Sequence, residues 1–392
     1  MTTQENKQIR MAQALSERAH DLLISLNFAQ KQIGYIHTFD ISYGENIAQR
    51  TMLEVEIAAA AKRQESSTTH HKYIAKASKH LHSVIEEAIA KQLHDLDTIY
   101  HEVVGIQDSV PAIFDILAVR SASVGRLEPL VNDLSWLGRE LVSLVNLPQY
   151  RKKNSKGTSI KVDTPALALR YLGLENLQMV IPTMAVRHWM PHATEPFGLM
   201  KRKMRELSMS TAIAAKELAP FFGVKEQHAF TLGMLLELGK IALVRLYLRT
   251  FERVWQAKVQ IARDKKQKDL HTALMELSPD PLFLRNLLLE HSADISRKLI
   301  EKMELRYLPF NAVMEEYSQT YLPKSHKKIA DPLPLTQVMQ KAYGYAQMLV
   351  LKDSQLIEDD EAEILLSHLE LTEEMRQQLA KCAFHNLQLT IL

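Results

Sequence analysis

The stretch AFTLGMLLELGKIALV (residues 229–244) decides the fold of this chain. Its apolar side chains cover most sides of a helix, which is typical of a helix buried inside a protein. The pattern predicts one helix over residues 232–248. Two charged residues, Glu237 and Lys240, interrupt the apolar pattern three positions apart. A buried charge without a partner is costly, so Lys240 is the expected partner of Glu237.

The composition favours an all-α fold. Only 12 of the 392 residues are glycine, well below the usual ~7%. Few glycines mean few tight hairpins, and no useful stretch alternates apolar and polar residues at the strand period. At about 150 residues per domain, the length suggests two or three domains.

Charge, cysteine content and hydropathy limit the function classes. The net charge of +2 is too balanced to indicate nucleic-acid binding. Cys382 is the single cysteine, which excludes an intrachain disulfide. The polar start of the chain lacks a signal-peptide core, and no apolar run approaches the ~18 residues of a membrane span. We therefore expect a cytoplasmic protein without a membrane segment.

The chain is expected to divide into three helical parts. Residues 1–105 form an N-terminal region of unknown role, with one helix over 52–63, a break at 66–69 and a long amphipathic helix over 71–103. That helix needs an apolar partner, which predicts that it packs on the rest of the chain. Residues 106–351 form the main domain, and residues 352–392, with a helix over 360–386, extend it.

Local signals mark several boundaries. Tyr43-Gly44 breaks the pattern before the first of these helices, and Gly105 precedes a helix start near Pro111. Thr164 followed by Pro165 is a strong helix start. The turn at 278–281 opens another helix, and the clearest loop covers residues 321–334.

Four stretches resemble the HDOD domain, the HD-related output domain of bacterial signalling proteins. They are SVPAIFDIL (109–117), LVSLVNLPQY (141–150), PALALRYLGLENL (165–177) and FTLGMLLELGKIALV (230–244). They occur in the family's order and at roughly its spacing. The resemblance implies a multi-helix, HD-like bundle and a signalling or scaffold module.

The same resemblance points to a degenerate HD site. HD phosphohydrolases carry Gly-Leu-Leu-His-Asp-Ile-Gly-Lys, in which the His-Asp pair binds the catalytic metal. Here Leu236 stands at the His position, Glu237 at the Asp position, and Leu207 at the position of an earlier metal-binding His. A leucine offers no lone pair to a metal. We therefore expect no metal, no cofactor and no catalysis.

The remaining polar residues leave a candidate ligand pocket of Glu237, Lys240 and His291, the last at a place where the family often carries a histidine. Two interpretations of the Glu237–Lys240 pair stay open. One is an ion pair on the helix surface, worth ~0.2–0.5 kcal/mol. The other is the remnant of a pocket that binds a small polar ligand.

Three function classes remain. The first is a non-catalytic signal-transduction or scaffold module with a signalling protein as partner; a small-molecule ligand and a homodimer remain open. The alternative is a metal-dependent phosphohydrolase of the HD superfamily acting on a nucleotide or cyclic dinucleotide, which would need His at positions 207 and 236. Nucleic-acid binding is disfavoured: the basic runs at 151–161, 201–205 and 263–268 lack an aromatic stacking platform.

The N-terminal histidines from His70 to His101 are interpreted as a solvated face.

Overall fold

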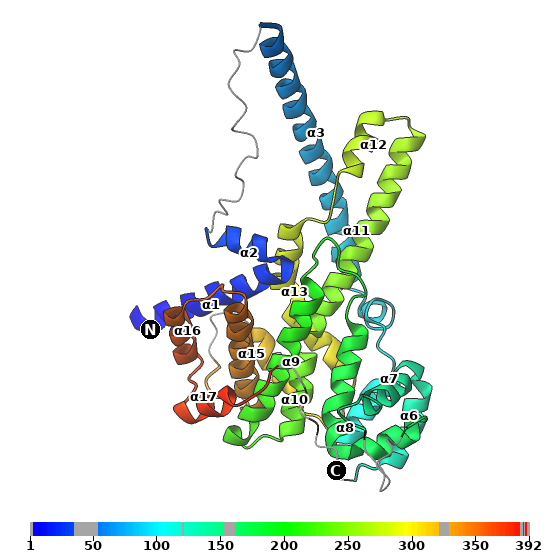
Figure 1. Cartoon of the computed structure of the whole chain (residues 1–392), viewed down its shortest axis with the longest axis vertical. Helices are drawn as coiled ribbons and strands as arrows, with labels where there is room; N and C mark the ends of the chain where they lie inside the picture. Colours follow the sequence, from blue (N-terminus) through cyan, green and yellow to red (C-terminus); the bar gives the residue numbers. More distant parts are fainter. Residues whose placement is uncertain are drawn as a thin grey trace.

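The computed structural model describes residues 3–34, 54–119, 121–151, 161–320 and 329–384, with Leu387 and Leu389. These parts of the chain are helical and contain no strand (Figure 1), which confirms the all-α prediction. The expected break at 43–44, most of the basic run at 151–161 and the loop at 321–328 lie outside the described residues.

The N-terminal part contains α1 (Thr3–Ile24), α2 (Leu26–Gln32), α3 (Glu54–Leu93), α4 (Leu96–Thr98) and the π-helical turn η1 (Ile99–Val104). The main domain begins with α5 (Ser109–Ala118), α6 (Val124–Asp133), α7 (Ser135–Val145), α8 (Pro165–Trp189), α9 (Met200–Leu218), η2 (Ala219–Phe222) and α10 (Glu226–Leu235). It continues with α11 (Leu238–Asp264), α12 (Lys268–Met275), α13 (Pro281–Lys302), α14 (Phe310–Thr320), α15 (Pro334–Asp353), α16 (Asp359–His368) and α17 (Glu373–Ala380).

The predicted helix starts and stops are largely confirmed. The Thr164 side chain accepts a hydrogen bond from the Leu167 N–H at 3.3 Å, and Pro165 opens α8. The Asp280 carboxylate accepts from the N–H groups of Leu282 and Phe283 at the start of α13. Gly105 ends η1 with φ of 80°, a left-handed conformation that glycine adopts without strain.

Four expected boundaries are wrong. The helix expected over 71–103 ends at Leu93, because Asp95 caps a new short helix, and the chain continues as α4 and η1. Helix α3 runs without a break from 54 to 93, because hydroxyl residues at 66–69 lower helix propensity by only tenths of a kcal/mol each. The helix expected over 360–386 splits into α16 and α17, because Glu370 takes a left-handed φ of 51° and Thr372 caps a new helix. The helix expected over 232–248 is interrupted at Leu236 and Glu237, which separate α10 from α11.

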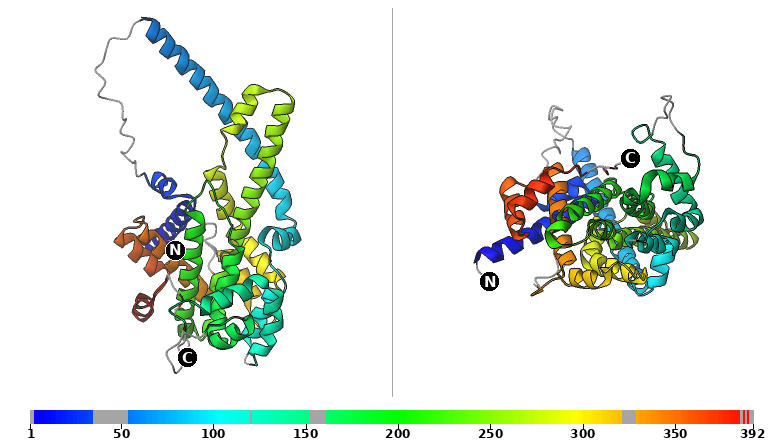
Figure 2. Two further views of the ribbon diagram at one scale, coloured as in Figure 1. Left: turned by 45° about the vertical axis from the view of Figure 1, so that its right-hand side comes forward. Right: turned by 90° about the horizontal axis from the view of Figure 1, so that it is seen from below.

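The helices pack around one apolar core. Figure 2 shows their arrangement from two further sides. Helix α9 lies at its centre and packs against α10 and α15, while α11 packs along α13. Helices α5 to α8 gather at one end of the bundle. Helix α1 crosses the other side and packs against α13, α15 and α16.

The long helix α3 projects beside α11 and α12 (Figure 1) and packs against both. Its side chains Leu81, Ile85 and Ile89 are fully buried. This part of the predicted apolar stripe therefore packs on the main domain, as expected. Among the described helices, none combines the length and the hydropathy that crossing a membrane requires.

Candidate functional site

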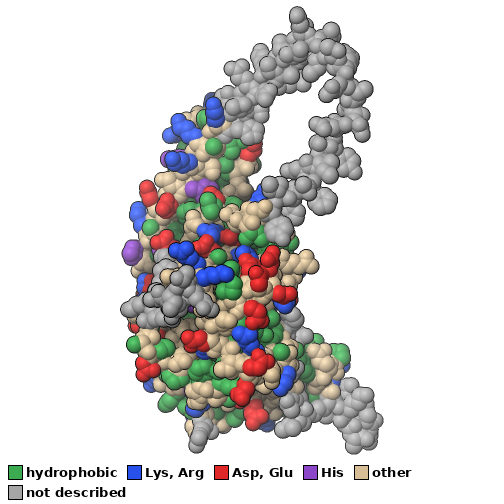
Figure 3. All heavy atoms as spheres, turned by 90° about the vertical axis from the view of Figure 1, so that its left-hand side faces the viewer, with side chains coloured by type: hydrophobic (Ala, Val, Ile, Leu, Met, Phe, Trp, Pro, Cys, Tyr) green, Lys and Arg blue, Asp and Glu red, His purple; other side chains and the backbone are tan. Residues whose placement is uncertain are grey.

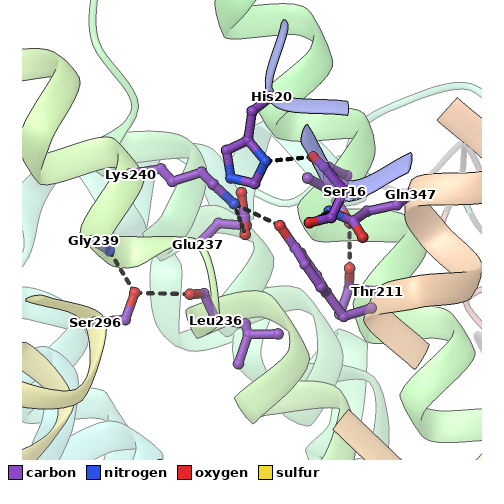
Figure 4. Close-up of polar contacts among 11 residues, drawn as sticks. Ser16, His20, Thr211, Leu236, Glu237, Gly239, Lys240, Ser296 and Gln347 are labelled. Carbon is purple, nitrogen blue, oxygen red and sulfur yellow. Dashed lines mark hydrogen bonds and ion pairs between the residues drawn. The ribbon is translucent and has the colours of Figure 1, made fainter. Parts of the chain in front are cut away.

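The break between α10 and α11 is held by a side chain from α13. The Ser296 hydroxyl donates a hydrogen bond to the Leu236 carbonyl at 2.8 Å and accepts one from the Gly239 N–H at 2.8 Å. Both backbone groups are buried, so without Ser296 they would remain unsatisfied. The serine thus stabilises the irregular backbone at Leu236 and Glu237 (Figure 4).

Gly239 lets α11 and α13 approach each other closely. A Cβ atom at this position would lie 2.0 Å from the Ser292 carbonyl oxygen and 2.7 Å from the Ser296 nitrogen, both of them backbone atoms. Neither can move without shifting α13. Gly239 of the motif is therefore needed for packing at this crossing, whatever the chemistry of the site.

Glu237 and Lys240 form a buried ion pair. The Lys240 Nζ lies 2.8 Å from Glu237 Oε1 and donates a second hydrogen bond to the Tyr343 hydroxyl at 2.6 Å. The exposed fractions of the two charged side chains are only 2% and 1%. The interpretation as a surface ion pair is therefore wrong: both charges lie in the core, where neighbouring helices cover them.

One oxygen of this pair has no partner. Glu237 Oε2 is buried, and no hydrogen-bond donor among the described residues reaches it. The Ser208 hydroxyl, next to Leu207 on α9, is also buried without a partner. An unsatisfied buried acceptor costs about 1–3 kcal/mol, and more when it is charged. The ammonium of Lys240 is therefore the main compensation for burying this carboxylate.

A histidine from α1 closes the site. The His20 Nδ1 donates a hydrogen bond to the Ser16 carbonyl at 2.7 Å, and the ring is buried near Lys240 (Figure 4). Burial, and then the positive charge of Lys240, hold the pKa of His20 well below its usual value. The ring is thus neutral and adds no second positive charge beside Lys240. Gln347 of α15 donates to the Ser16 hydroxyl at 3.2 Å.

The structure brings together two of the three predicted pocket residues. The side chain of His291 is 38% exposed and lies 4.0 Å from the Glu290 carboxylate, an environment unlike that of the buried pair. Leu207 and Leu236 are both buried in the apolar core. His20, Ser296 and Tyr343 were not predicted. They lie far from Lys240 in the sequence, and no local pattern marks them.

The other clusters lie largely on the surface. His80, His94 and His101 are exposed, as a solvated face requires. His82 is partly buried against the rings of Phe251 and Phe283, so the prediction is wrong for this residue.

Of the basic run at the start of α9, Lys203 is buried and pairs with Glu206 at 2.9 Å, whereas the other basic residues, Lys201, Arg202 and Arg205, are exposed. The run at 263–268 lies at the turn between α11 and α12.

These residues do not fit the divalent metal that an HD motif implies. A catalytic metal needs about three protein ligands and an open position. Leu207 and Leu236 supply no donor atom, and Lys240 already occupies one oxygen of Glu237. In the described parts of the chain, no group of three or more His, Cys, Asp or Glu side chains is arranged to hold a metal ion.

Comparison with known proteins supports the family. Residues 106–279 match the family model of the HDOD domain. Glu237 and Lys240 lie within the matched residues, whereas His20, Ser296 and Tyr343 lie outside them. No curated protein matches the chain.

One solved structure is similar, a protein from Shewanella amazonensis SB2B named "Putative phosphohydrolase". It shares 19% sequence identity, covers 73% of this chain and 96% of its own, and superposes with a TM-score of 0.40.

Proposed function

We propose that this chain, which matches the HDOD family model over residues 106–279, is a non-catalytic signal-transduction or scaffold module. It would act through protein–protein contacts, with a signalling protein as its partner. The observation that carries this proposal is the buried, internally neutralised Glu237–Lys240 pair. It stands at the place where an HD enzyme would bind its metal.

Charge argues against a metal at this position. In a hydrolase, the metal would neutralise the carboxylate and activate water. Here an ammonium group already lies 2.8 Å from the single carboxylate. A divalent cation would have to displace the Lys240 ammonium from this carboxylate inside the core. The lysine thus takes the electrostatic role of the metal but cannot activate water.

The lack of solvent access to the Glu237–Lys240 pair also argues against catalysis. Tyr343 from α15 accepts a hydrogen bond from Lys240. His20 from α1 lies beside Lys240 (Figure 4). With exposed fractions of 1% and 2%, neither charged side chain can meet a substrate phosphate from solvent. The alternative, a phosphohydrolase acting on a nucleotide or cyclic dinucleotide, needs both histidine ligands and an open cleft. The described residues meet neither requirement, since Leu207 and Leu236 stand at the histidine positions and the Glu237–Lys240 pair is buried.

Phosphate release tests the proposal. Purified protein is incubated with Mn²⁺ and, separately, a nucleotide, a cyclic dinucleotide and p-nitrophenyl phosphate. We expect no metal-dependent turnover, because no ligand set holds the metal. Turnover that requires Mn²⁺ and disappears in Glu237→Gln would contradict the proposal. Glu301→Gln, at a largely exposed carboxylate, is the matched control.

A further inference from the structure

Helix α1 covers a surface formed by helices distant in sequence, and this surface is called the groove below. It packs against α9, α13, α15 and α16, and all of α1 precedes the matched HDOD residues by about 80 positions or more. Apolar side chains facing the groove, such as Leu15, Leu22 and Leu23, are at most 2% exposed. An amphipathic helix with its apolar face in a groove is a recurring mode of protein–peptide recognition.

Charged pairs fix α1 on both edges of this groove. On one edge, Arg285 of α13 donates to Asp21 at 2.7 Å and to Glu17 at 3.1 Å. On the other edge, Arg18 donates to both carboxylate oxygens of Glu361 on α16, at 2.8 and 3.0 Å. On this side of the molecule, acidic and basic side chains are interspersed (Figure 3). Such charge-assisted, directional contacts set the register of a docked helix.

The centre of the groove is polar. Ser16 and His20 of α1 meet Gln347, Lys240 and Glu237, and one glutamate oxygen stays unsatisfied. Buried polar contacts of this kind add little net stability, but they can specify which helix fits and in which register. The groove therefore discriminates among helices by chemistry as well as by apolar area.

We propose that this groove is a helix-binding site and that α1 is its displaceable intramolecular occupant. The partner that fits is an amphipathic helix with two carboxylates four residues apart, as Glu17 and Asp21 are, facing Arg285. Its apolar positions follow the spacing of Ala12, Leu15, Ala19 and Leu22. The inference rests on the proposed binding function. Displacement of α1 opens the apolar floor and the Lys240–Glu237 pair to the partner.

Peptide exchange in a cleaved full-length chain tests this site. A protease recognition sequence is inserted within residues 35–53, which connect α2 to α3, and the folded protein is cut there. A fluorescent peptide of residues 1–34 is then added and its binding followed by anisotropy. We expect the peptide to replace the resident fragment, and the unlabelled peptide to compete, while circular dichroism shows the remaining chain folded.

Charge reversal tests the assigned contacts. Arg285→Glu in the larger fragment of the cleaved protein should weaken peptide binding by at least about tenfold, since one partner of a desolvated charge pair is reversed. A peptide carrying Glu17→Arg and Asp21→Arg should bind this variant better than it binds the unaltered chain. A peptide with Arg10→Glu, on the exposed side of α1, should bind like the original.

Two results would overturn the proposal. One is a cleaved protein that keeps its resident fragment and takes up no labelled peptide over days. The other is a larger fragment that unfolds whenever the resident N-terminal fragment leaves. Either would make α1 a permanent part of the core. Neither would touch the proposed lack of catalysis, which phosphate release measures separately.

Discussion

Replacing Lys240 by methionine is expected to destabilise the fold by about 3–5 kcal/mol, because it leaves the Glu237 carboxylate buried without a counter-charge. The lysine is 1% exposed, so water cannot take over the lost contact. Methionine keeps most of the apolar side-chain volume, which separates the loss of charge from the loss of packing. The free energy of unfolding from urea titration, at a pH where the carboxylate is ionised in the unfolded chain, measures the effect.

The double variant Lys240→Met, Glu237→Leu is the control. Exchanging a whole buried ion pair for apolar residues of similar volume is often neutral or stabilising. The double variant should therefore recover most of the stability that the single variant loses. A single variant as stable as the original protein would mean that the carboxylate is not held as an ion in the core.

Gly239→Ala is expected to cost about 3 kcal/mol or more, or to prevent folding. The added Cβ would meet two backbone atoms of α13, at 2.0 and 2.7 Å, so the two helices would have to separate. Their separation would also break the hydrogen bonds of Ser296 to Leu236 and Gly239. Thermal unfolding and the yield of folded protein would both report the change.

Gly125→Ala, on α6, is the matched control. A Cβ atom there meets nothing within 4 Å, and alanine is the better helix former by ~1 kcal/mol. This variant should match or slightly exceed the stability of the original protein. Equal losses at the two glycines would show that the close approach of α11 to α13 is not what requires Gly239.

The sequence predicted those features that depend on residues close together in the chain. An apolar pattern on all sides predicted that the helix through residue 240 is buried, and Thr164 and Asp280 begin helices as their residue types predict. The motif at 230–244 predicted the match to the HDOD family model, which covers residues 106–279. All of these signals act over a few residues, at the spacing of a helical turn.

The site's partners could not be predicted in this way. Tyr343 is 103 residues from Lys240, and Ser296 is 60 residues from Leu236. Nothing in the spacing of either residue indicates what it contacts. The break between α10 and α11 was missed for the same reason: Leu236 and Glu237 suit a helix by propensity, and the hydroxyl that stabilises the break comes from α13. Whether the Glu237–Lys240 pair is exposed or buried likewise depends on α1 and α15, which local patterns do not place.

The metal content of the purified protein is the most direct test of the central claim, that Lys240 stands in for the metal of an HD site. The protein is incubated with Mn²⁺, passed through a desalting column and measured by elemental analysis. We predict far less than one metal ion per chain, unchanged by Glu237→Gln. One tightly bound ion per chain in the original protein, lost in Glu237→Gln, would contradict the claim.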